Sequence, residues 1–360
     1  LYPLIRLPLY AVVAYASSTV EVALILGPST PPPLAVAIVR WMNDPDLAMR
    51  FMASAAALLQ VAVTFTALAL WRAGEVVTAR LARGWLTAGG RGAAEPAVAA
   101  VGAGGIAFTL AAAGGGVLAL ALWSFAGFWR FPDALPGAWS ARAWGMVADA
   151  PVLFTNAAAI GGTATLLAVV LVVGALEHEI RRGRPAGRAA RLVLFLPLLV
   201  PAVAFLFGLV LLAERAGLAP GSALVVAGHL VFVLPYVYLA LAEAYRRLDP
   251  RWSAVARALG ASPARTFLTV RLPMLSRAVL TAAAVGFAVS IGQYLPTQLL
   301  GAGRVPTITT EAVALAAGGD RRLAAAYGLA QSLLPFAGFW LAYGVPRVVF
   351  RHRRGMGAGP

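Results

Sequence analysis

The sequence predicts an all-α fold, a polytopic bundle of about eight transmembrane helices. Of the 360 residues, 61% are hydrophobic and only 12% are charged, whereas a soluble domain is about half apolar and a quarter charged. Uncharged runs of about 20 residues are long enough to cross the hydrocarbon core of a bilayer as helices. Backbone in lipid must satisfy its own hydrogen bonds, and the repeated alternating strands of a barrel are not visible in the sequence.

Apolar segments of the required length follow one another along the chain. Their approximate boundaries are 7–26, 48–71, 97–124, 153–176, 192–213, 222–244, 277–300 and 323–346. The first segment also loosely fits a secretory signal peptide, because Arg6 precedes an apolar run with Ala-Tyr-Ala at 14–16. We favour a membrane span for two reasons. The apolar stretch continues to residue 27, and the chain does not begin with Met, which indicates that it is the remainder of a longer protein.

The positions of the basic residues predict the orientation of the bundle. All 29 are arginines, and 21 of them lie in or beside four segments, with eight in the opposite loops. The four segments are 72–96, 177–191, 245–276 and 347–360. Because positive charge gathers on the cytoplasmic side, we expect these segments, and both termini of this chain, to be cytoplasmic. The net charge of +15 then reflects membrane topology, and no nucleic-acid partner is expected.

Several kinds of chemistry are missing from the sequence. There is no cysteine, and the three histidines, His178, His229 and His352, lie far apart, so no metal site is expected. There is no cluster of catalytic residue types, so no catalytic residue and no enzyme activity are expected. Without lysine the chain cannot form a phosphate-binding P-loop. The glycine clusters at 102–105 and 111–117 lie inside a span and indicate close helix packing instead.

A weak internal repeat relates residues 24–60 to residues 298–334 at one constant offset. The matching pairs are Leu26 and Leu300, Gly27 and Gly301, Pro32 and Pro306, Val39 and Val313, Asp46 and Asp320, and Leu59 and Leu333. Residues 73–96 are polar, basic and rich in glycine, which indicates a cytoplasmic linker. We therefore expect residues 1–72 to be the last two transmembrane helices of a preceding copy, 97–349 to be a complete six-helix domain and 350–360 to be a cytoplasmic tail.

The polar segment 248–275 interrupts the apolar chain and predicts two short helices at the membrane surface. Asp249 can cap the first helix, with Pro250 at its first position, and Gly260 supplies the left-handed residue that ends it. Ser262 and Pro263 start the second helix in the same way. Four arginines of this segment are expected to face water: Arg251, Arg257, Arg265 and Arg271. On periodicity alone, a basic amphipathic helix that only anchors the bundle is an alternative.

The end of this segment resembles the cytoplasmic signature loop of binding-protein-dependent ABC importer permeases. That signature reads Glu-Ala-Ala, three residues, Gly, nine residues, Ile, one residue and Leu-Pro. Here nine residues separate Gly260 from Val270-Arg271-Leu272-Pro273, while Ala254, Val255 and Ala256 stand in place of the acidic triplet. Residues 195–209 and 292–335 also look like this family, most of all like its duplicated thiamine- and iron(III)-type members.

The resemblance implies a permease subunit of an ABC importer in the bacterial inner (plasma) membrane. Such a subunit lies among membrane lipid, forms a path for a small-molecule solute, and binds no cofactor itself, because ATP is bound by an ABC ATPase subunit dimer. A periplasmic or extracellular solute-binding protein would dock on the outer loops 27–47, 130–152 and 301–322. The resemblance gives the ATPase-coupling role to Asp249, Trp252, Val255, Ala256, Arg257, Leu259, Gly260, Val270, Leu272 and Pro273.

Polar residues at membrane depth are candidates for the solute path, because they are costly to place in lipid. They are Glu21, Asn156, His229, Gln293 and Tyr294. For His229 and Gln293 the alternative is an interhelical hydrogen bond. Two other functions stay open: an ATP-independent secondary transporter or channel, which would need mid-membrane acids and inverted repeats, and a structural membrane subunit.

Overall fold

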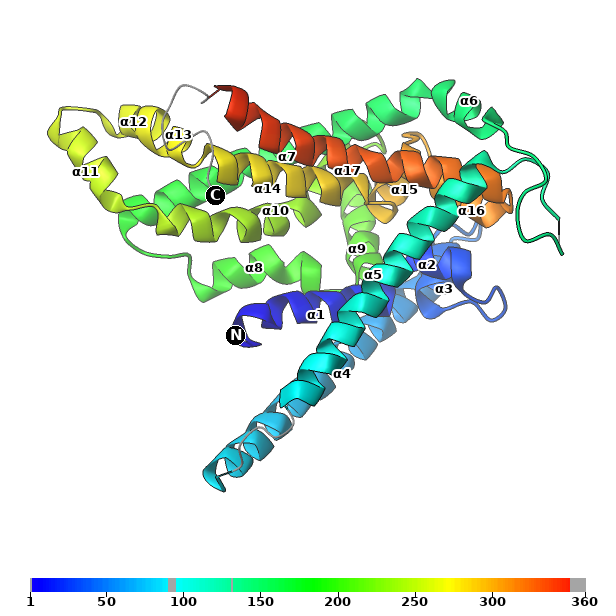
Figure 1. The fold of residues 1–360 in the computed structure, drawn as a ribbon, viewed down its shortest axis with the longest axis horizontal. Helices are drawn as coiled ribbons and strands as arrows, with labels where there is room; N and C mark the ends of the chain where they lie inside the picture. Colours follow the sequence, from blue (N-terminus) through cyan, green and yellow to red (C-terminus); the bar gives the residue numbers. More distant parts are fainter. Residues whose placement is uncertain (1, 90–94, 131, 350–360) are drawn as a thin grey trace. The chain divides into compact units, whose positions relative to one another are not determined.

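The computed structural model describes residues 2–89, 95–130 and 132–349, and in these ranges the regular structure is helical, with one isolated β-bridge (Figure 1). The first half holds α1 (Tyr2–Ser18), α2 (Val20–Leu26), α3 (Leu34–Met42), α4 (Met49–Thr87), α5 (Glu95–Phe125), α6 (Arg142–Ala148) and α7 (Pro151–Arg182). The second half holds α8 (Arg188–Leu199), α9 (Ala202–Arg215), α10 (Ser222–Arg247), α11 (Pro250–Ala258), α12 (Pro263–Thr266), the π-helical turn η1 (Phe267–Arg271), α13 (Leu272–Met274), α14 (Ser276–Ile291), α15 (Leu295–Gly301), α16 (Ile308–Gly318) and α17 (Arg321–Val349).

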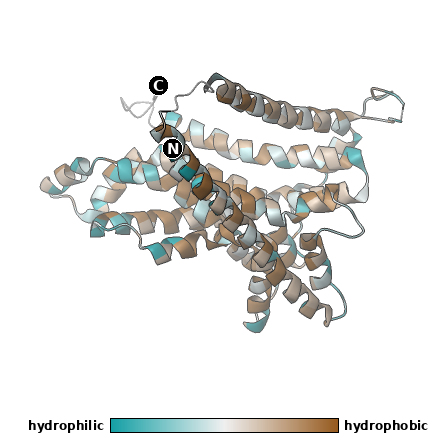
Figure 2. Cartoon of the chain, turned by 90° about the horizontal axis from the view of Figure 1, so that it is seen from below, coloured by the Kyte–Doolittle hydropathy of each residue, from teal (hydrophilic) through white to brown (hydrophobic). Residues whose placement is uncertain are grey.

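The lengths and compositions of these helices confirm the predicted fold class. Among the described residues, five single helices are long and apolar enough to cross a membrane: α4, α5, α7, α10 and α17. Three bent pairs of helices bring the number to eight if each pair counts as one span. Hydrophobic residues cover most of the length of these helices, as Figure 2 shows by colour. The chain is therefore an all-α polytopic membrane protein.

Several predicted segments differ from the observed ones, and the first of them, the expected span 7–26, is divided between α1 and α2. The expected span 277–300 is divided, because α14 ends at Ile291 and α15 begins at Leu295. The expected span 192–213 is interrupted at Pro201, which has no N–H to donate and disfavours helical geometry in the residue before it. Much of the expected linker is helical, since α4 continues to Thr87. Residues 90–94 of that linker and the expected tail 350–360 lie outside the described residues.

The helices group into two compact units. The first unit holds α1 to α6, together with short parts of α9, α16 and α17. The second holds α7, α8, α10 to α15 and the remaining parts of α9, α16 and α17. Each unit has its own set of buried residues.

In the first unit, α1 and α3 pack against α4. The break between α1 and α2 follows from three consecutive hydroxyl residues, because such side chains compete for helix carbonyls and bend helices. Ser17 and Ser18 both donate to Ala14 O, at 2.8 and 3.1 Å, and Thr19 donates to Tyr15 O at 2.8 Å.

The glycine clusters of α5 do not pack as the sequence predicted. A Cβ placed at Gly102, Gly105 or Gly115 would meet no atom of the described residues within 4 Å. Helix α5 contacts α6, and its clustered glycines lie along the exposed part of the helix. Their small size therefore serves no close contact with the described part of the chain.

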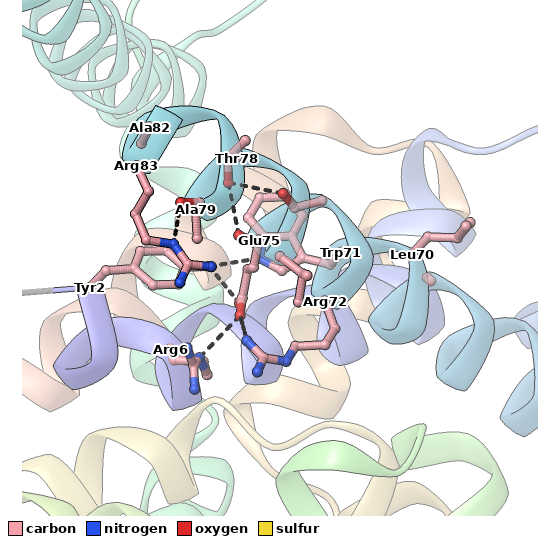
Figure 3. A pocket seen from close by; sticks show the side chains of 13 residues that line it. Tyr2, Arg6, Leu70, Trp71, Arg72, Glu75, Thr78, Ala79, Ala82 and Arg83 are labelled. Carbon is pink, nitrogen blue, oxygen red and sulfur yellow. Dashed lines mark hydrogen bonds and ion pairs between the residues drawn. The ribbon is translucent and has the colours of Figure 1, made fainter. Parts of the chain in front are cut away.

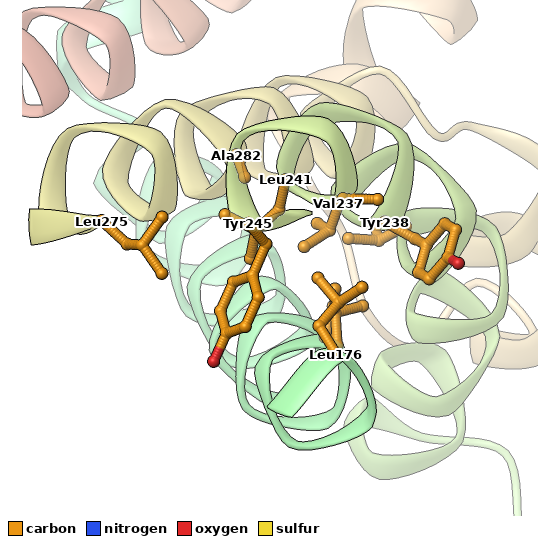
Figure 4. Close-up of a cluster of buried hydrophobic side chains, with 11 residues drawn as sticks. Leu176, Val237, Tyr238, Leu241, Tyr245, Leu275 and Ala282 are labelled. Atoms are coloured by element: carbon orange, nitrogen blue, oxygen red, sulfur yellow. The ribbon is translucent and has the colours of Figure 1, made fainter. Parts of the chain in front are cut away.

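In the second unit, α7, α10 and α14 form the packed centre. Its buried cluster contains Leu176, Val237, Leu241, Tyr245 and Leu275 (Figure 4). The helices approach closely at glycine, as membrane helices often do. A Cβ at Gly286 of α14 would lie 2.8 Å from Val237 Cγ2, so only glycine fits there without displacing α10.

The predicted repeat extends over four helices. With the offset of 274 that relates residue 24 to residue 298, the start of each of α1, α2, α3 and α4 falls within two residues of the start of α14, α15, α16 and α17 respectively. The breaks also coincide, because the gap between α1 and α2 corresponds to the gap between α14 and α15. The same succession of helices is thus used twice in the chain.

Candidate functional site

The segment 248–275 folds locally as its residues predict. The Asp249 carboxylate accepts a hydrogen bond from Arg251 N at 2.9 Å, with Pro250 at the first position of α11. Gly260 follows the helix with a φ of +82°, in the left-handed region that glycine favours, and its N–H donates to Arg257 O at 2.9 Å. Ser262 Oγ accepts from Arg265 N at 3.2 Å and caps α12. These caps make a stiff, well-defined turn of chain.

Helix α11 presents an apolar face that is largely exposed in the described part of the chain. Trp252, Val255 and Leu259 are 54%, 56% and 83% exposed, and their spacing places them on one side of the helix. No residue of α11 is buried, and the helix lies at one end of the α7–α10–α14 bundle (Figure 1). Ala256 is half-buried and Arg257 is exposed beside this face. The predicted coupling helix is therefore available to a partner.

The other half of the predicted motif returns to the bundle. Val270, Leu272 and Pro273 are half-buried, and the chain bends by 72° between the helical stretches Pro263–Met274 and Ser276–Ile291. The chain thus turns near Pro273, as the sequence predicted, and that this turn leads back into the membrane stays a prediction. The two ends of the segment are thus different, one exposed and one packed.

Arg271 anchors this return, contrary to the prediction that it faces water. Its side chain is buried, with the residue only 6% exposed, because the π-helical turn η1 directs it toward the ends of α7 and α10. Arg271 Nη1 lies 3.4 Å from Glu177 Oε2, and the guanidinium carbon lies 5.3 Å from the centre of the Tyr245 ring. Tyr245 also donates from its hydroxyl to Glu177 Oε2 at 2.7 Å. The other three arginines of the segment are exposed, as predicted.

A second acidic residue of α7, two positions after Glu177, also joins α7 to α10. Glu179 pairs with Arg246 of α10 at 3.0 Å, and Arg246 donates to the Tyr238 hydroxyl at 2.7 Å. The sequence reasoning missed both Glu177 and Glu179. Their signal was present, because they are two carboxylates at the end of an apolar span and next to a run of arginines.

His229 is the centre of a buried hydrogen-bond network at the break between α14 and α15. It is 3% exposed, with Nδ1 2.7 Å from Ser290 Oγ and Nε2 2.9 Å from Thr297 Oγ1. Thr297 Oγ1 donates to Gln293 O at 2.9 Å, so it accepts from the imidazole, and the neutral ring carries its proton on Nε2. The structure therefore shows the interhelical hydrogen bonds that were the alternative for His229, and its place in a solute path stays a prediction.

The other pathway candidates occupy different surroundings. Gln293 and Tyr294 lie in the break after α14 and not inside a span, since Gly292 and the following residues leave the helix. Gln293 Nε2 approaches His229 O at 3.5 Å, so the structure brings these two candidates together. Asn156 donates to Pro306 O at 2.8 Å. Glu21 is half-buried in the first turn of α2.

Side chains that the sequence reasoning passed over satisfy the carbonyls freed at the two breaks. Gln60 of α4 donates to Ser17 O at 2.7 Å, and Thr309 of α16 donates to Ile291 O at 2.5 Å. Ser17 and Ile291 are equivalent positions of the repeat. In the expected outer loop 301–322, Thr307 and Thr309 are 4% exposed, so they are structural and do not face a soluble partner.

The described residues contain no group of three His, Asp or Glu side chains that could hold a metal ion. The geometry instead combines a stiff exposed helix, a buried anchor and a bundle of apolar helices. Residues 164–349 match the family described as binding-protein-dependent transport system inner membrane component. The chain belongs to this family of inner-membrane permeases. The matched range includes the whole 248–275 loop and α14 to α17.

Curated relatives carry related names. The inner membrane ABC transporter permease protein YnjC of Escherichia coli is 34% identical over 362 residues, covering 98% of this chain and 63% of the relative. The molybdenum transport system permease protein ModB of Mycobacterium bovis is 34% identical over 143 residues, covering 36% of this chain and 54% of the relative. The spermidine/putrescine transport system permease protein PotC homolog of Mycoplasma genitalium is 33% identical over 87 residues, which are 24% of this chain and 30% of the relative. The chain thus spans less than two thirds of each of these relatives.

Proposed function

We propose that the chain is a permease subunit of an ABC importer, which forms the solute path and couples to a separate ATPase through the 248–275 loop. The observation that carries this proposal is the form of the loop. Helix α11 exposes Trp252, Val255 and Leu259 to a partner, while Arg271 at the other end of the loop is buried against α7 and α10. A push on α11 would therefore reach the bundle through a fixed contact.

The partners follow from the family. A dimer of ABC ATPase subunits binds and hydrolyses ATP, and its closure moves α11, which rocks the bundle between two states. A periplasmic or extracellular solute-binding protein delivers the solute to the outer side. The cytoplasmic location of the 248–275 loop and of both termini is part of this proposal and is supported by the distribution of arginines.

The missing acidic triplet gives the partner surface a specific character. Where the family signature has Glu-Ala-Ala, this chain has Ala254, Val255 and Ala256, and arginines 251 and 257 flank them. The loop therefore offers an apolar face bordered by positive charge. We expect the receiving cleft of the ATPase to be apolar, with carboxylates at its edge.

The domain organisation belongs to the same proposal. Residues 1–72 are the last two transmembrane helices of one permease copy, and residues 97–349 are the six-helix domain of the next. The recurrence of four helices at an offset of 274 residues supports this division. The 34% identity to a longer permease along 98% of this chain is consistent with it.

Membership of the family does not identify the solute. The relatives' names mention spermidine/putrescine and molybdenum, and none mentions thiamine, so the thiamine-type assignment stays a prediction. The same names describe permeases of transport systems, which gives no support to an ATP-independent transporter or to a purely structural subunit.

Copurification with the ATPase tests the docking role. Gly260→Pro removes the N–H that donates to Arg257 O and cannot adopt the φ of +82°, and Arg257→Glu reverses a charge beside the apolar face. Both variants should insert in the membrane but lose the ATPase during purification. Arg304→Glu, in an expected outer loop, is the matched control and should retain it. Normal ATPase recovery with both loop variants would contradict the proposal.

A further inference from the structure

A large cavity lies between α1 and the second half of α4, both in the first unit (Figure 3). Its volume is about 1190 Å³. Its polar lining includes Tyr2, Arg6, Arg72, Glu75 and Arg83. None of these residues belongs to the coupling loop or to the candidate solute path, so the cavity calls for a separate explanation.

The cavity is positively charged although it contains a carboxylate. Glu75, whose side chain is only 7% exposed, accepts hydrogen bonds from the Tyr2 hydroxyl and from Arg72 Nη1, both at 2.6 Å, and lies 3.2 Å from Arg6 Nε. One carboxylate thus orients two guanidinium groups. Arg83 adds a third, and no ion pair joins it to another described residue. Three arginines against one glutamate leave two positive charges for an outside anion.

The cavity lies where α4 passes from an apolar to a basic stretch, which is the pattern expected at the boundary between hydrocarbon and headgroups. Its wall includes Ala67 and Leu70 from the apolar part of the helix, while Arg72 and Arg83 come from the basic part that follows. Trp71 lies between these parts and donates from Nε1 to the Tyr2 hydroxyl at 3.1 Å. Tryptophan and tyrosine concentrate at this depth in membrane proteins. The cavity therefore has an apolar end and a cationic end.

We propose that this cavity binds the headgroup of an anionic phospholipid from the arginine-rich side of the membrane. The phosphate would be held by Arg72 and Arg83, with Glu75 keeping Arg72 in place, and an acyl chain would run along Ala67 and Leu70. Basic pockets between transmembrane helices on the cytoplasmic side are suited to such lipids. The site needs no coupling to an ATPase, so it does not depend on the proposed transport function.

The second copy of the repeat lacks the matching charged residues at the three positions that the structure describes. At the offset of 274, Arg6, Arg72 and Glu75 correspond to Leu280, Pro346 and Val349. All three replacements are uncharged, so none of them can bind a phosphate by charge. The charges of Arg6, Arg72 and Glu75 are therefore particular to the first copy and not a consequence of the shared helix arrangement.

Native mass spectrometry of the purified full chain, delipidated and then titrated with phosphatidylglycerol or phosphatidylcholine, tests the proposal. The intact chain should bind one phosphatidylglycerol with clear preference. Because one basic residue near an anionic surface contributes about 1 kcal/mol, Arg83→Ala should weaken that binding about fivefold, and Arg72→Ala with Arg83→Ala about 25-fold. Arg83→Lys should retain most of the affinity. Arg80→Ala, an exposed arginine of α4 that does not line the cavity, is the matched control.

Thermal unfolding with the same two lipids separates binding from folding. Phosphatidylglycerol should raise the Tm of the intact chain and of Arg80→Ala, and should no longer raise that of the double variant, whose Tm in phosphatidylcholine stays near that of the intact chain. Equal binding of both lipids by the intact chain would overturn the proposal. An equal loss of phosphatidylglycerol binding in Arg80→Ala and Arg83→Ala would also overturn it. Failure of the intact chain to bind either lipid would do the same.

Discussion

The four helices α1 to α4 and the four helices α14 to α17 follow the same plan but fulfil different tasks. In both, a helix breaks near its end, a short helix follows, and a donor from a later helix satisfies the freed carbonyl, Gln60 at Ser17 O and Thr309 at Ile291 O. The donors come from different places, α4 in one copy and α16 in the other. A broken helix in lipid thus requires a donor, but the repeat does not fix which residue supplies it.

The arginine-rich ends of the two copies differ more. The second copy is preceded by the exposed α11 and the buried Arg271, whereas the first copy carries the cluster of Arg6, Arg72 and Glu75. Each end combines arginine, tyrosine and glutamate. Beside the second copy, these groups hold the 248–275 loop against the bundle, and in the first copy they line an open cavity. By our two proposals, one helix plan has been adapted to force transmission in one copy and to lipid binding in the other.

The largest expected effect distinguishes these two charge clusters. Arg271→Met removes the buried cation of its cluster, while Glu177 keeps the half-exposed Arg181 at 2.9 Å and the Tyr245 hydroxyl. The loss should therefore stay near the lower end of the about 3–5 kcal/mol that a fully broken buried pair costs. Arg6→Met should cost less, because the Arg6 side chain is 38% exposed whereas that of Arg271 is 8% exposed, and solvent screens an exposed pair. Unfolding of both variants in the same detergent measures the difference. A double-mutant cycle with Glu177→Gln should recover part of the loss in Arg271→Met, and equal losses in Arg6→Met and Arg271→Met would refute the distinction.

A smaller effect is expected where the two copies pack differently. Gly286 of α14 corresponds to Val12 of α1. Gly286→Val installs the residue of the first copy, but a Cβ there would lie 2.8 Å from Val237 Cγ2, so overpacking should destabilise the chain by about 1–3 kcal/mol. Val12 is 62% exposed, and Val12→Leu should change stability by less than about 0.5 kcal/mol. Comparable unfolding midpoints for the two variants would show that α14 is not tightly packed.

The smallest effect concerns the feature that the copies share. Gln60→Leu and Thr309→Val each remove the side-chain donor to a carbonyl at a helix break. Hydrogen bonds between membrane helices contribute about 0.6 kcal/mol on average and about 1.7 at most, so each variant should lose an amount in this range. Unfolding free energies of the two variants should therefore be similar. If only one of the two variants lost stability, the two helix breaks would be stabilised by different interactions.

The sequence predicted most of the fold because long apolar runs, Asp249-Pro250 and Gly260 act locally. A helix satisfies its own backbone hydrogen bonds in lipid, so a long apolar run predicts a helix. The start and end of α11 are set by capping residues that act on their immediate neighbours. The interruptions were harder to see, since Ser17, Ser18 and Thr19 look like an ordinary small polar patch inside an apolar run. Their effect depends on a donor 43 residues away, Gln60.

The candidate site was predictable on its exposed side and not on its buried side. Trp252, Val255 and Leu259 share a helix face that spacing alone reveals. Arg271 was expected in water because charge argues for exposure, and only the arrangement of Glu177 and Tyr245, from two other helices, explains its burial. For the same reason the hydroxyl partners of His229, which come from α14 and α15, could not be chosen from the sequence.

Thiol cross-linking tests the central claim most directly, because the chain has no cysteine and a single introduced thiol is unique. Val255 on α11 and Leu135 in an expected outer loop are 56% and 63% exposed. We predict that Val255→Cys is labelled only from the cytoplasmic side and cross-links to an ATPase subunit in assembled membranes, while Leu135→Cys is labelled from outside and does not. Labelling of Val255→Cys from the outer side, or a complex with ATPase in which it forms no cross-link, would contradict the account.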